Sequence, residues 1–450
     1  MARRHIHYGR TTGEAIMREQ FVENRRIAIE NELAAKQTKI RRLACAGCTS
    51  TAKQPLLQAL ADQEEAVLNG RLQTVIFIKD TNREGQELSG EKRQIAIGIV
   101  GPGLIGKTLL SQLAQQTCRL SEEWGLELQV FGVTNSQWML LSATPIGLSS
   151  WQTALESQDT EASLDSFTYH FATSPVADRV IIDCTASAAV PCHYTKWLSL
   201  GIHVITPNKR LGSGPLADYL AVREAQRRYK AHFMAEGTVG AGLPVLSTLQ
   251  SMINTGDKVQ KIEGIFSGTL SFIFNNFGPG RPFSDVVSKA KAAGYTEPDP
   301  REDLSGMDVS RKVVILAREC GMQIELEDVT VQSLVPEPLQ STSSVLDFMD
   351  RLPQFDADME AQASEAADTG KKLVYVGLVD VAAGTCSVSL QSYPADHAFA
   401  QLSGSDNIIA FTTRRYSQQP LMIRGPGAGA EVTAAGVFGD LLQVAQSLGA

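Results

Sequence analysis

The sequence predicts an α/β protein in which a parallel sheet covered by helices is followed by a mixed α+β unit. Between residues 94 and 236, buried-type apolar runs alternate with helical stretches, and strands separated by helices form parallel sheets. A glycine-rich turn directly follows the first of these runs. Further on, residues 373–381 and 386–390 alternate apolar and polar side chains, as antiparallel strands do.

Composition narrows the class of protein. The 450 residues are enough for two or three domains, and 43% hydrophobic and 20% charged residues are typical of a globular chain. No apolar run is long enough to span a membrane. The net charge of −8 argues against a nucleic-acid or anionic-membrane partner. Seven scattered cysteines indicate a reducing compartment, so we expect the cytoplasm, or the plastid stroma if the source is photosynthetic.

Residues 1–93 form an N-terminal extension whose role the sequence leaves open. Residues 24–43 and 52–72 read as amphipathic helices, and residues 74–78 as a short strand. Cys45 and Cys48 form a lone pair without a second ligand pair nearby, so a zinc or redox role is the weaker alternative. Glutamates among the N-terminal arginines do not favour a targeting peptide.

The first candidate site is the glycine turn between a strand at 95–100 and a helix at 107–120. Gly101, Gly103 and Gly106 form the G-x-G-x-x-G pattern, whose glycines allow a tight turn, close approach of a pyrophosphate and packing of helix on sheet. With Lys107 and Thr108, the same stretch also satisfies the phosphate-loop pattern of nucleoside-triphosphate enzymes.

Side-chain size favours the dinucleotide turn of a Rossmann-type domain. Leu104 and Ile105 are bulky for a triphosphate cradle, but they suit the first turn of a helix that packs on a sheet. In the rival interpretation, the strand that ends at Asp183 would bind magnesium. The strand at 126–133 ends in Asn135 and Ser136, without an acid for an NAD ribose. Either NADP or NAD is therefore compatible, with a preference for NADP.

Later turns extend this sheet edge. Thr185 follows a strand at 180–182 and could line the cofactor, while Lys209 follows a strand at 202–205. Lys209 reaches the same edge or is a solvated loop lysine. The loop from Glu236 to Leu243 is either a plain turn or a hard-cation site of backbone oxygens. An apolar helix at 432–442 could dock back on the nucleotide-binding domain.

The densest group of acids lies in residues 294–312 and leads into a helix. On that helix Asp308 and Lys312 are four residues apart and share a face. The lysine could protonate a substrate oxygen while Glu297, Asp303 and Asp308 hold an ammonium group. Acids alone would raise the pKa of the lysine, so burial or a second cation such as Lys209 must oppose them. Alternatively, Ser305 and Asp308 form a capping box, or Asp308 and Lys312 an ordinary surface pair.

Taken in order, these motifs resemble homoserine dehydrogenase, in the form found as the C-terminal half of bifunctional aspartate kinase–homoserine dehydrogenases. The resemblance covers about residues 95–449 and rests on GIVGPGLIG (98–106), TPNK (206–209), EGTVGAGLP (236–244), GYTEPDPREDL (294–304), GMDVSRK (306–312) and GPGAG (425–429). No kinase motif of the Lys-Phe-Gly-Gly-Thr-Ser type occurs in residues 1–90. That region does not resemble the family's regulatory domain either, so feedback inhibition by threonine is not implied.

The resemblance implies NAD(P)-dependent interconversion of L-homoserine and L-aspartate 4-semialdehyde in threonine, isoleucine and methionine biosynthesis. It implies that Lys312 is the acid–base catalyst, with Lys209 beside the nicotinamide, and that Glu297, Asp303 and Asp308 hold the substrate. The implied cofactor residues are Gly101, Gly103, Leu104, Ile105, Gly106, Thr185, Lys209 and Gly427. A sodium ion would be bound by backbone oxygens of Glu236, Val239, Ala241 and Leu243.

The resemblance also implies the domain organisation. A Rossmann-type nucleotide-binding domain would span residues 94–236 and be completed by 420–450, and an α+β catalytic and dimerisation domain would span 237–419 and form a homodimer. Two rival functions stay open from the sequence, a phosphate-loop nucleotidase and a catalytically inactive paralogue that acts as a binding subunit.

Overall fold

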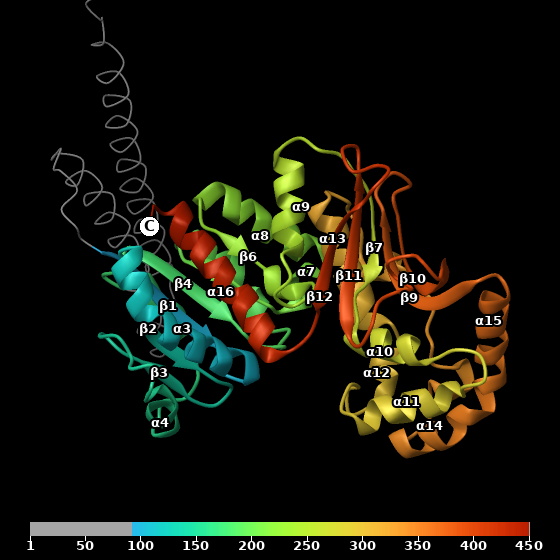
Figure 1. The fold of residues 1–450 in the computed structure, drawn as a ribbon. Helices are drawn as coiled ribbons and strands as arrows, with labels where there is room; N and C mark the ends of the chain where they lie inside the picture. The colour runs from blue at the N-terminus through green and yellow to red at the C-terminus, as the bar shows by residue number, and fades with distance from the viewer. Residues whose placement is uncertain (1–91, 450) are drawn as a thin grey trace, which may run out of the picture. The chain divides into compact units, whose positions relative to one another are not determined.

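Two six-stranded sheets organise the part of the chain that the computed structural model describes, residues 92–449 (Figure 1). The first has the order β3-β2-β1-β4-β5-β6 and the second β12-β11-β7-β9-β10-β8. The predicted α/β fold class, a Rossmann-type sheet with a second mixed sheet, is confirmed. The helices and strand predicted within residues 1–91, and the Cys45–Cys48 pair, lie outside the described residues.

The first sheet is parallel except for β3, which pairs antiparallel with β2. The bounds of its strands are β1 Arg93–Val100, β2 Leu126–Thr134, β3 Met139–Leu141, β4 Asp178–Asp183, β5 His203–Ile205 and β6 Phe233–Met234. The four predicted strands are present, each within two residues of its expected ends. Because β1 and β4 are central and β2 and β5 flank them, the turns after β1 and β4 meet at one edge of the sheet.

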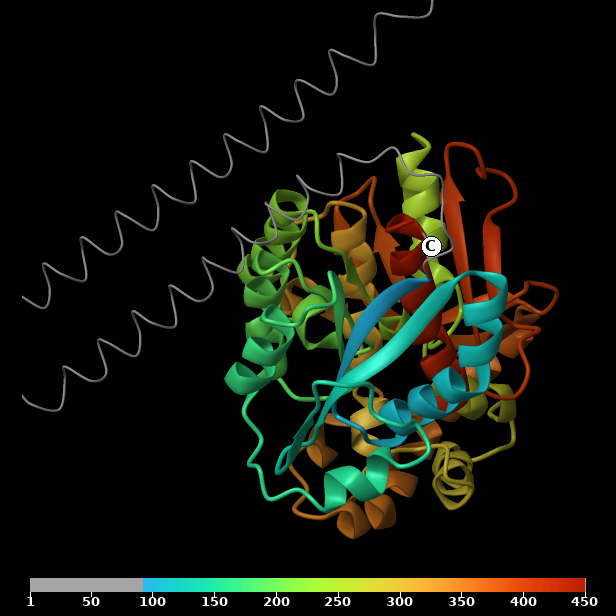
Figure 2. The same ribbon diagram turned by 90° about the vertical axis from the view of Figure 1, so that its left-hand side faces the viewer.

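Helices cover both faces of this sheet, as continuous apolar strands require (Figure 2). Ile95, Ile97 and Ile99 of β1 contribute to the apolar cluster that α3 (Leu104–Glu123) and α16 (Ala430–Ser447) complete on one face. Ala96 and Val100 contribute to the opposite cluster, which is completed by α5 (Leu164–Ala172), α6 (Tyr194–Ser199) and α8 (Leu216–Tyr229).

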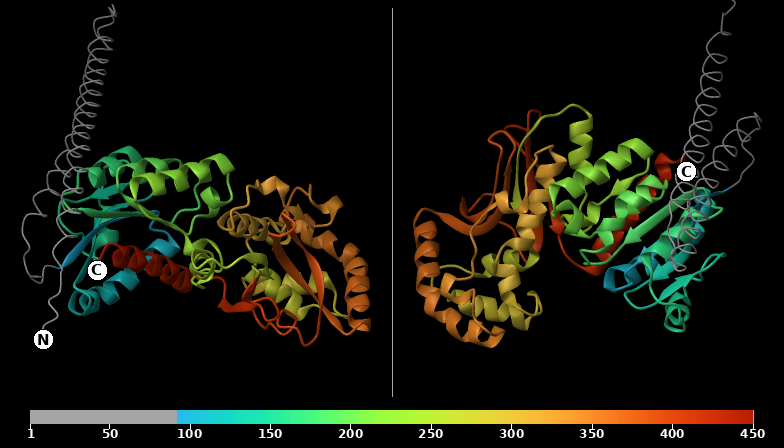
Figure 3. Two further views of the ribbon diagram at one scale, coloured as in Figure 1. Left: turned by 90° about the horizontal axis from the view of Figure 1, so that it is seen from above. Right: turned by 180° about the vertical axis from the view of Figure 1, so that it is seen from behind.

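The C-terminal helix α16 returns from the second sheet to the first and lies alongside α3 (Figures 1 and 3). Its buried residues Val437 and Leu441 belong to the same cluster as β1. The helix also approaches the 240–242 loop closely, because a Cβ on Gly242 would lie 2.1 Å from the carbonyl oxygen of Val432. The docking predicted for the apolar helix at 432–442 is therefore observed.

The second sheet is antiparallel apart from the short pairing of β8 with β10. Its strands are β7 Val259–Ile265, β8 Thr330–Val331, β9 Lys371–Asp380, β10 Thr385–Pro394, β11 Asp406–Thr413 and β12 Leu421–Pro426. The helices of this half and the remaining short helices are α4 Trp151–Glu156, α7 Lys209–Gly212, α9 Val245–Asn254, α10 Gly268–Asn276, α11 Phe283–Ala292, α12 Pro300–Leu304, α13 Met307–Glu319, α14 Val345–Arg351 and α15 Asp356–Asp368. The antiparallel strands predicted around 373–381 and 386–390 are confirmed as β9 and β10.

Helix α13 packs on β9 and β10 of the second sheet and also contacts α7, which follows β5 of the first sheet. Its apolar residues Val309, Val313 and Leu316 recur at helical spacing and are all buried. Among the described helices, none combines the length and apolar character that a membrane crossing demands. Helix α13 therefore connects the two halves, as α16 does, and the candidate site lies at its first turns.

Candidate active site

A cleft with a volume of about 740 Å³ opens at the carboxyl edge of the first sheet. Gly101 and Gly103 line it from the turn after β1, Ser136 from the end of β2, and Thr185 from the end of β4. This is the switch point at which doubly wound sheets bind nucleotides. Among the described residues, the lining does not include five of the predicted cofactor residues, namely Leu104, Ile105, Gly106, Lys209 and Gly427.

The three glycines of the turn meet three different steric demands. Gly101 has φ +82°, and a Cβ there would lie 2.5 Å from Cγ2 of Thr185. A Cβ on Gly106 would lie 2.6 Å from the carbonyl oxygen of Gly101, so only glycine lets α3 pack this closely. Gly103, in contrast, has no atom within 4 Å of the Cβ position and borders the cleft. Tight turn, close packing and open access are the requirements of the dinucleotide fingerprint, so the residues fit an NAD(P) cofactor.

The first turn of α3 differs in part from the prediction. Ile105 packs against the core, as expected. Leu104 is 75% exposed, so of these two bulky residues only Ile105 contributes to the packing of the helix on the sheet. Leu104 is the first residue of the helix, and at that position its side chain lies beyond the sheet edge.

Asp183 at the end of β4 does not serve as a magnesium ligand. The carboxylate is fully buried and accepts hydrogen bonds from the Tyr194 hydroxyl (2.5 Å), the Thr185 N–H (2.8 Å) and the Asn208 amide (3.0 Å). Burial raises the pKa of Asp183, and these donors oppose the increase. Both carboxylate oxygens accept hydrogen bonds from residues of the neighbouring segments. The phosphate-loop interpretation therefore lacks its magnesium site.

Asn208 connects the cleft to the second part of the site. Its amide nitrogen also donates to the Ser187 carbonyl at 2.9 Å, while its Oδ1 accepts from the Arg210 N–H at 3.0 Å and caps α7. Lys209 is therefore the first residue of a short helix whose start is tied to the cleft wall. The alternative of a solvated loop lysine is wrong.

Asp308 is shared between two lysines from different halves of the chain. Its Oδ1 lies 2.8 Å from Nζ of Lys209 on α7, and its Oδ2 lies 2.9 Å from Nζ of Lys312, one turn further along α13. Nζ of Lys312 also donates to the Phe266 carbonyl at 2.6 Å. The sequence predicted the pairing on α13, but only the fold brings Lys209 to the other carboxylate oxygen.

Burial decides the protonation chemistry of this cluster. Only 8% of the Lys312 side chain is exposed. Burial lowers the pKa of Lys312, Asp308 opposes this change, and Lys209 reinforces it. Desolvation disfavours ionised Asp308, but the charges of Lys312 and Lys209 outweigh it and hold the pKa of that carboxyl below its usual range. The opposition between burial and charge that we expected for Lys312 is observed, and burial is the largest contribution.

The capping-box alternative for Asp308 is wrong. Ser305 continues α12 in a helical conformation, and its hydroxyl donates to the Glu302 carbonyl at 2.7 Å. The N-cap of α13 is instead Gly306, which has φ +75° and provides no side-chain cap. The carboxylate of Asp308 is thus free of a capping role and is directed to the two lysines.

Glu297 and Asp303 are held near this cluster by a tight loop. The backbone N–H of Glu297 donates to Oδ2 of Asp303 at 2.8 Å. Desolvation and the charges of Asp303, Glu302 and Asp308 raise the pKa of Glu297, whereas Lys209 lowers it. Burial likewise raises the pKa of Asp303. The negative charges of these acids repel one another, and a bound cationic group would reduce that repulsion.

Gly427 lies on the lysine side of the site. A Cβ on Gly427 would fall 1.9 Å from the amide nitrogen of Asn407, a fully buried residue whose Nδ2 donates to the Phe266 carbonyl at 3.0 Å. That carbonyl is the one that accepts from Lys312. Asn407 was not predicted, because an asparagine within an apolar strand gives no local signal of its partner.

The loop from Glu236 to Leu243 lies between β6 and α9 and turns sharply. Gly240 and Ala241 have φ values of +77° and +57°, so successive carbonyls face different directions. The carbonyls of Glu236 and Leu243 accept hydrogen bonds from the N–H groups of Val239 (3.3 Å) and Val245 (2.8 Å). Within residues 92–449 no group of His, Cys, Asp and Glu side chains is arranged to hold a metal, so any cation here depends on backbone oxygens.

Comparison with known families places this geometry in context. Residues 101–236 match the family described as "Homoserine dehydrogenase, NAD binding domain", and residues 244–442 match "Homoserine dehydrogenase". Residues 1–90 match a "Domain of unknown function (DUF4464)".

Individual relatives agree with the family matches. A chloroplastic bifunctional aspartokinase/homoserine dehydrogenase 2 from Zea mays is 56% identical over 360 residues, which are 80% of this chain and 39% of that protein. The homoserine dehydrogenase of Schizosaccharomyces pombe is 43% identical over 365 residues, 79% of this chain and 97% of that protein. A crystal structure of a Candida auris protein of unknown function aligns with a TM-score of 0.74 at 36% identity, covering 79% of this chain and 99% of that one.

A glycine-rich cleft at the switch point of a parallel sheet defines the class, a protein with a Rossmann-type NAD(P)-binding domain. Within that class, the chain belongs to the homoserine dehydrogenase family.

The different environments of two glycines in the turn give a test of the cleft. Gly103→Ala should leave thermal stability unchanged, because its Cβ meets no atom within 4 Å, yet weaken NADPH binding about tenfold or more by filling the approach to the pyrophosphate. Gly101→Ala should lower the melting temperature as well, because of its φ and its contact with Thr185. Fluorescence titration and thermal denaturation measure the two effects. Wild-type NADPH affinity in Gly103→Ala would place the cofactor elsewhere.

Proposed function

We propose that the chain is a homoserine dehydrogenase that interconverts L-homoserine and L-aspartate 4-semialdehyde with NADP or NAD, with Lys312 as its acid–base catalyst. The Asp308 carboxylate shared between Lys312 and Lys209, close to a nucleotide cleft, is the observation that carries this proposal. The matched region is 39% of the length of the maize relative, and the proposal concerns the dehydrogenase reaction alone. It places the chain in threonine, isoleucine and methionine biosynthesis.

The buried amine of Lys312 is suited to move a proton in both directions. When homoserine is oxidised, the hydroxyl proton passes to the neutral amine; when the aldehyde is reduced, the ammonium returns it to the oxygen. Burial lowers the pKa of Lys312 and thereby increases the neutral fraction near working pH. The bound nicotinamide supplies the hydride acceptor or donor. Lys209 would lie next to the reacting oxygen and hold Asp308 in place.

The acidic loop is suited to hold the amino acid. We propose that Glu297 and Asp308 bind the substrate ammonium, with Asp303 fixing the loop through the Glu297 N–H. Desolvation and the neighbouring carboxylates raise the pKa of Glu297, and a bound ammonium would offset the repulsion between these carboxylates. Such a grip orients the carbinol carbon toward the nicotinamide.

NADP is the cofactor that we favour over NAD. The strand β2 ends at Thr134, and the following Asn135 and Ser136 offer no carboxylate to the ribose of NAD. Oδ1 of Asn135 accepts from the N–H groups of Gln137 and Trp138 and shapes this turn. Ser136 and Lys107 line the cleft and could contact a 2′-phosphate.

A sodium ion on backbone oxygens of Glu236, Val239, Ala241 and Leu243 belongs to the same proposal. The buried carboxylate of Asp440 accepts the Glu236 N–H at 2.9 Å. Burial and the charge of Glu236 raise the pKa of Asp440 to about 8. A cation in this loop would stabilise the carboxylates of Glu236 and Asp440. Backbone oxygens are also the kind of donor that hard cations prefer.

Three further features remain proposals. Residues 94–236 with 420–450 would form the nucleotide-binding domain, and residues 237–419 the catalytic domain, except that β12 (Leu421–Pro426) pairs with β11 and belongs to the second sheet. Alternate residues of β12 are exposed at that sheet's edge, which supports a homodimer that light scattering would detect. The compartment would be the cytoplasm or the plastid stroma, which localisation of the tagged chain decides.

The central assay follows the absorbance of reduced nicotinamide. The wild-type chain should reduce NADP, and more slowly NAD, in the presence of L-homoserine, and replacement of sodium by choline should lower the rate. Hydrolysis of ATP with magnesium and no homoserine-dependent signal would instead establish a phosphate-loop nucleotidase. The absence of both activities would identify a catalytically inactive paralogue.

Removal of the lysine amine tests the proton transfer. Lys312→Ala should lower kcat roughly 10²- to 10⁴-fold, the usual contribution of a general acid–base group, while the Kd for NADP stays near normal. Lys372→Ala is the matched control, because Lys372 is a half-buried lysine whose pKa burial also lowers but which donates to Asn275 and the Ala400 carbonyl. Normal kcat in Lys312→Ala would remove that residue from catalysis.

Neutralising one acid tests substrate binding. Glu297→Gln should raise KM for homoserine about tenfold with a smaller change in kcat, because a charge-assisted contact is lost. Glu302→Gln, an exposed acid in the same cluster, should leave KM unchanged. Equal KM values for wild type and Glu297→Gln would disprove the ammonium-binding role.

A further inference from the structure

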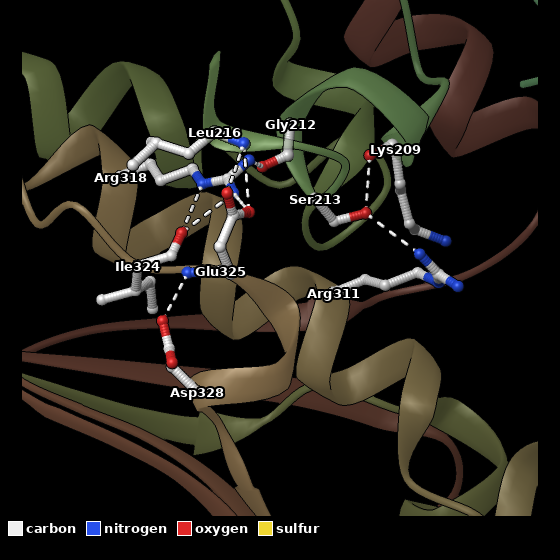
Figure 4. A network of polar contacts seen from close by, with 9 residues as sticks. All are labelled: Lys209, Gly212, Ser213, Leu216, Arg311, Arg318, Ile324, Glu325 and Asp328. Atoms are coloured by element: carbon white, nitrogen blue, oxygen red, sulfur yellow. Dashed lines mark hydrogen bonds and ion pairs between the residues drawn. The ribbon is translucent and has the colours of Figure 1, made fainter. Parts of the chain in front are cut away.

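Helix α13 carries a buried arginine, Arg318, that the proposed reaction does not use. Its side chain is fully shielded, and a guanidinium is costly to bury unless its donors are satisfied. Nη1 donates to the Gly212 carbonyl at 3.0 Å, while Nε and Nη2 donate to the Ile324 carbonyl at 3.1 and 2.9 Å (Figure 4). Nη2 also pairs with Oε2 of Glu325 at 2.9 Å. The arginine thus binds two separate segments at once, the end of α7 and residues 324–325.

One of these segments is α7, the four-residue helix that begins with Lys209. Arg318 holds its last residue, Gly212, and Arg311, about two helical turns earlier on α13, donates to Oγ of Ser213 at 3.4 Å. That hydroxyl in turn donates to the Lys209 carbonyl at 2.9 Å (Figure 4). A helix this short is unstable without such contacts. The C-terminal end of α7 is therefore held by α13, while Asn208 holds its start.

Steric fit at the contact allows little play. A Cβ on Gly212 would lie 2.8 Å from Cγ1 of Ile315, so glycine lets α7 lie directly on α13. The same face of α13 that receives α7 continues toward Lys312 and Asp308.

Glu325 extends the connection to α8. Both of its carboxylate oxygens accept the Leu216 N–H at 3.0 Å, at the first residue of that helix. A carboxylate at this end is stabilised by the helix dipole. The Arg318 guanidinium also lies over the Tyr219 ring of α8, 5.6 Å from its centroid. A single ion pair consequently holds the end of α7 and the start of α8.

We infer that Arg318, together with Glu325, is a positioning residue that fixes α7 on α13 and so sets Lys209 against Asp308 and Lys312. Its catalytic consequence rests on the proposed function. Lys209 is on α7, which follows β5 of the first sheet, and Lys312 is on α13, which packs on the second sheet. The short α7 segment must therefore be immobilised for both amines to reach one carboxylate. If α7 loosens, Lys209 withdraws and Asp308 pairs with Lys312 alone.

The groups that face Lys312 determine the sign of the effect. Asp308 comes from its own helix, Lys209 from α7, and the Phe266 carbonyl from the segment before α10. Asp308 raises the pKa of Lys312 and Lys209 lowers it. Withdrawal of Lys209 removes the lowering contribution and leaves Asp308, so the pKa of Lys312 rises.

The test compares Arg318→Met and Arg318→Lys with a control, Arg223→Met, in the full 450-residue chain. Arg223 belongs to α8 and pairs with Glu319 of α13 at 3.2 Å. The control therefore loses a contact between α8 and α13 and leaves the contacts of α7 intact. Competitive acetylation of lysines across pH, read by peptide mass spectrometry, gives the pKa of Lys312 without requiring activity. Thermal denaturation and the pH profile of kcat complete the measurements.

Arg318→Met should raise the pKa of Lys312 by roughly half a unit or more, shift the half-maximal pH of homoserine oxidation upward to match, and lower kcat about tenfold by misplacing Lys209. Arg318→Lys, which keeps the charge but not the fork of donors, should fall between Arg318→Met and wild type. Arg223→Met should lower the melting temperature and leave the titration of Lys312 unchanged.

A wild-type titration of Lys312 in Arg318→Met, with a loss of stability like that of Arg223→Met, would overturn the inference. If Arg318→Met does not fold, Glu325→Gln decides, because it removes the charge partner while preserving shape; it should shift the titration in the same direction, and no shift would overturn the inference. A wild-type chain that fails to oxidise homoserine would refute the proposed function alone, since the labelling still reports the positioning.

Discussion

The structure depends on one carboxylate that two lysines share. Asp308 accepts Lys209 on one oxygen and Lys312 on the other, with distances of 2.8 and 2.9 Å. Each lysine comes from a different half of the described chain, and like charges this close repel strongly outside such a bridge. The arrangement therefore requires that α7 and α13 be held in register, and it explains why the contacts between them are so specific.

Burial supplies the chemistry and hydrogen bonding supplies the geometry. The amine of Lys312 is shielded from water, which lowers its pKa, while the Phe266 carbonyl and Asp308 direct its donors. At the neighbouring sheet edge, buried Asp183 accepts hydrogen bonds from Thr185, from Tyr194 at the start of α6 and from Asn208, and so links the cleft to Asn208. In both places a polar group inside the protein is tolerated because its partners are complete. Local networks of this kind let loops keep a defined shape next to an open cleft.

Much of the fold was predictable, because the relevant signals are short-range. Apolar runs such as that around Ile97 and the glycine turn at Gly101 specify strand and turn from a few adjacent residues. The exposure of Leu104 was not predictable, because local sequence does not say where the sheet edge ends. The capping box failed for a related reason. Ser305 is the C-cap residue of α12, and the end of that helix depends on packing.

Sequence alone determined the periodic elements, the nucleotide turn and the pairing of Asp308 with Lys312, since residues four apart on a helix must share a face. Tertiary structure alone decided that Lys209 completes the cluster, that Asn407 supports the Phe266 carbonyl, and that Arg318 fixes α7 on α13. The physical reason is distance along the chain. Contacts between residues about 100 positions apart arise from the packing of whole elements, which no local pattern encodes.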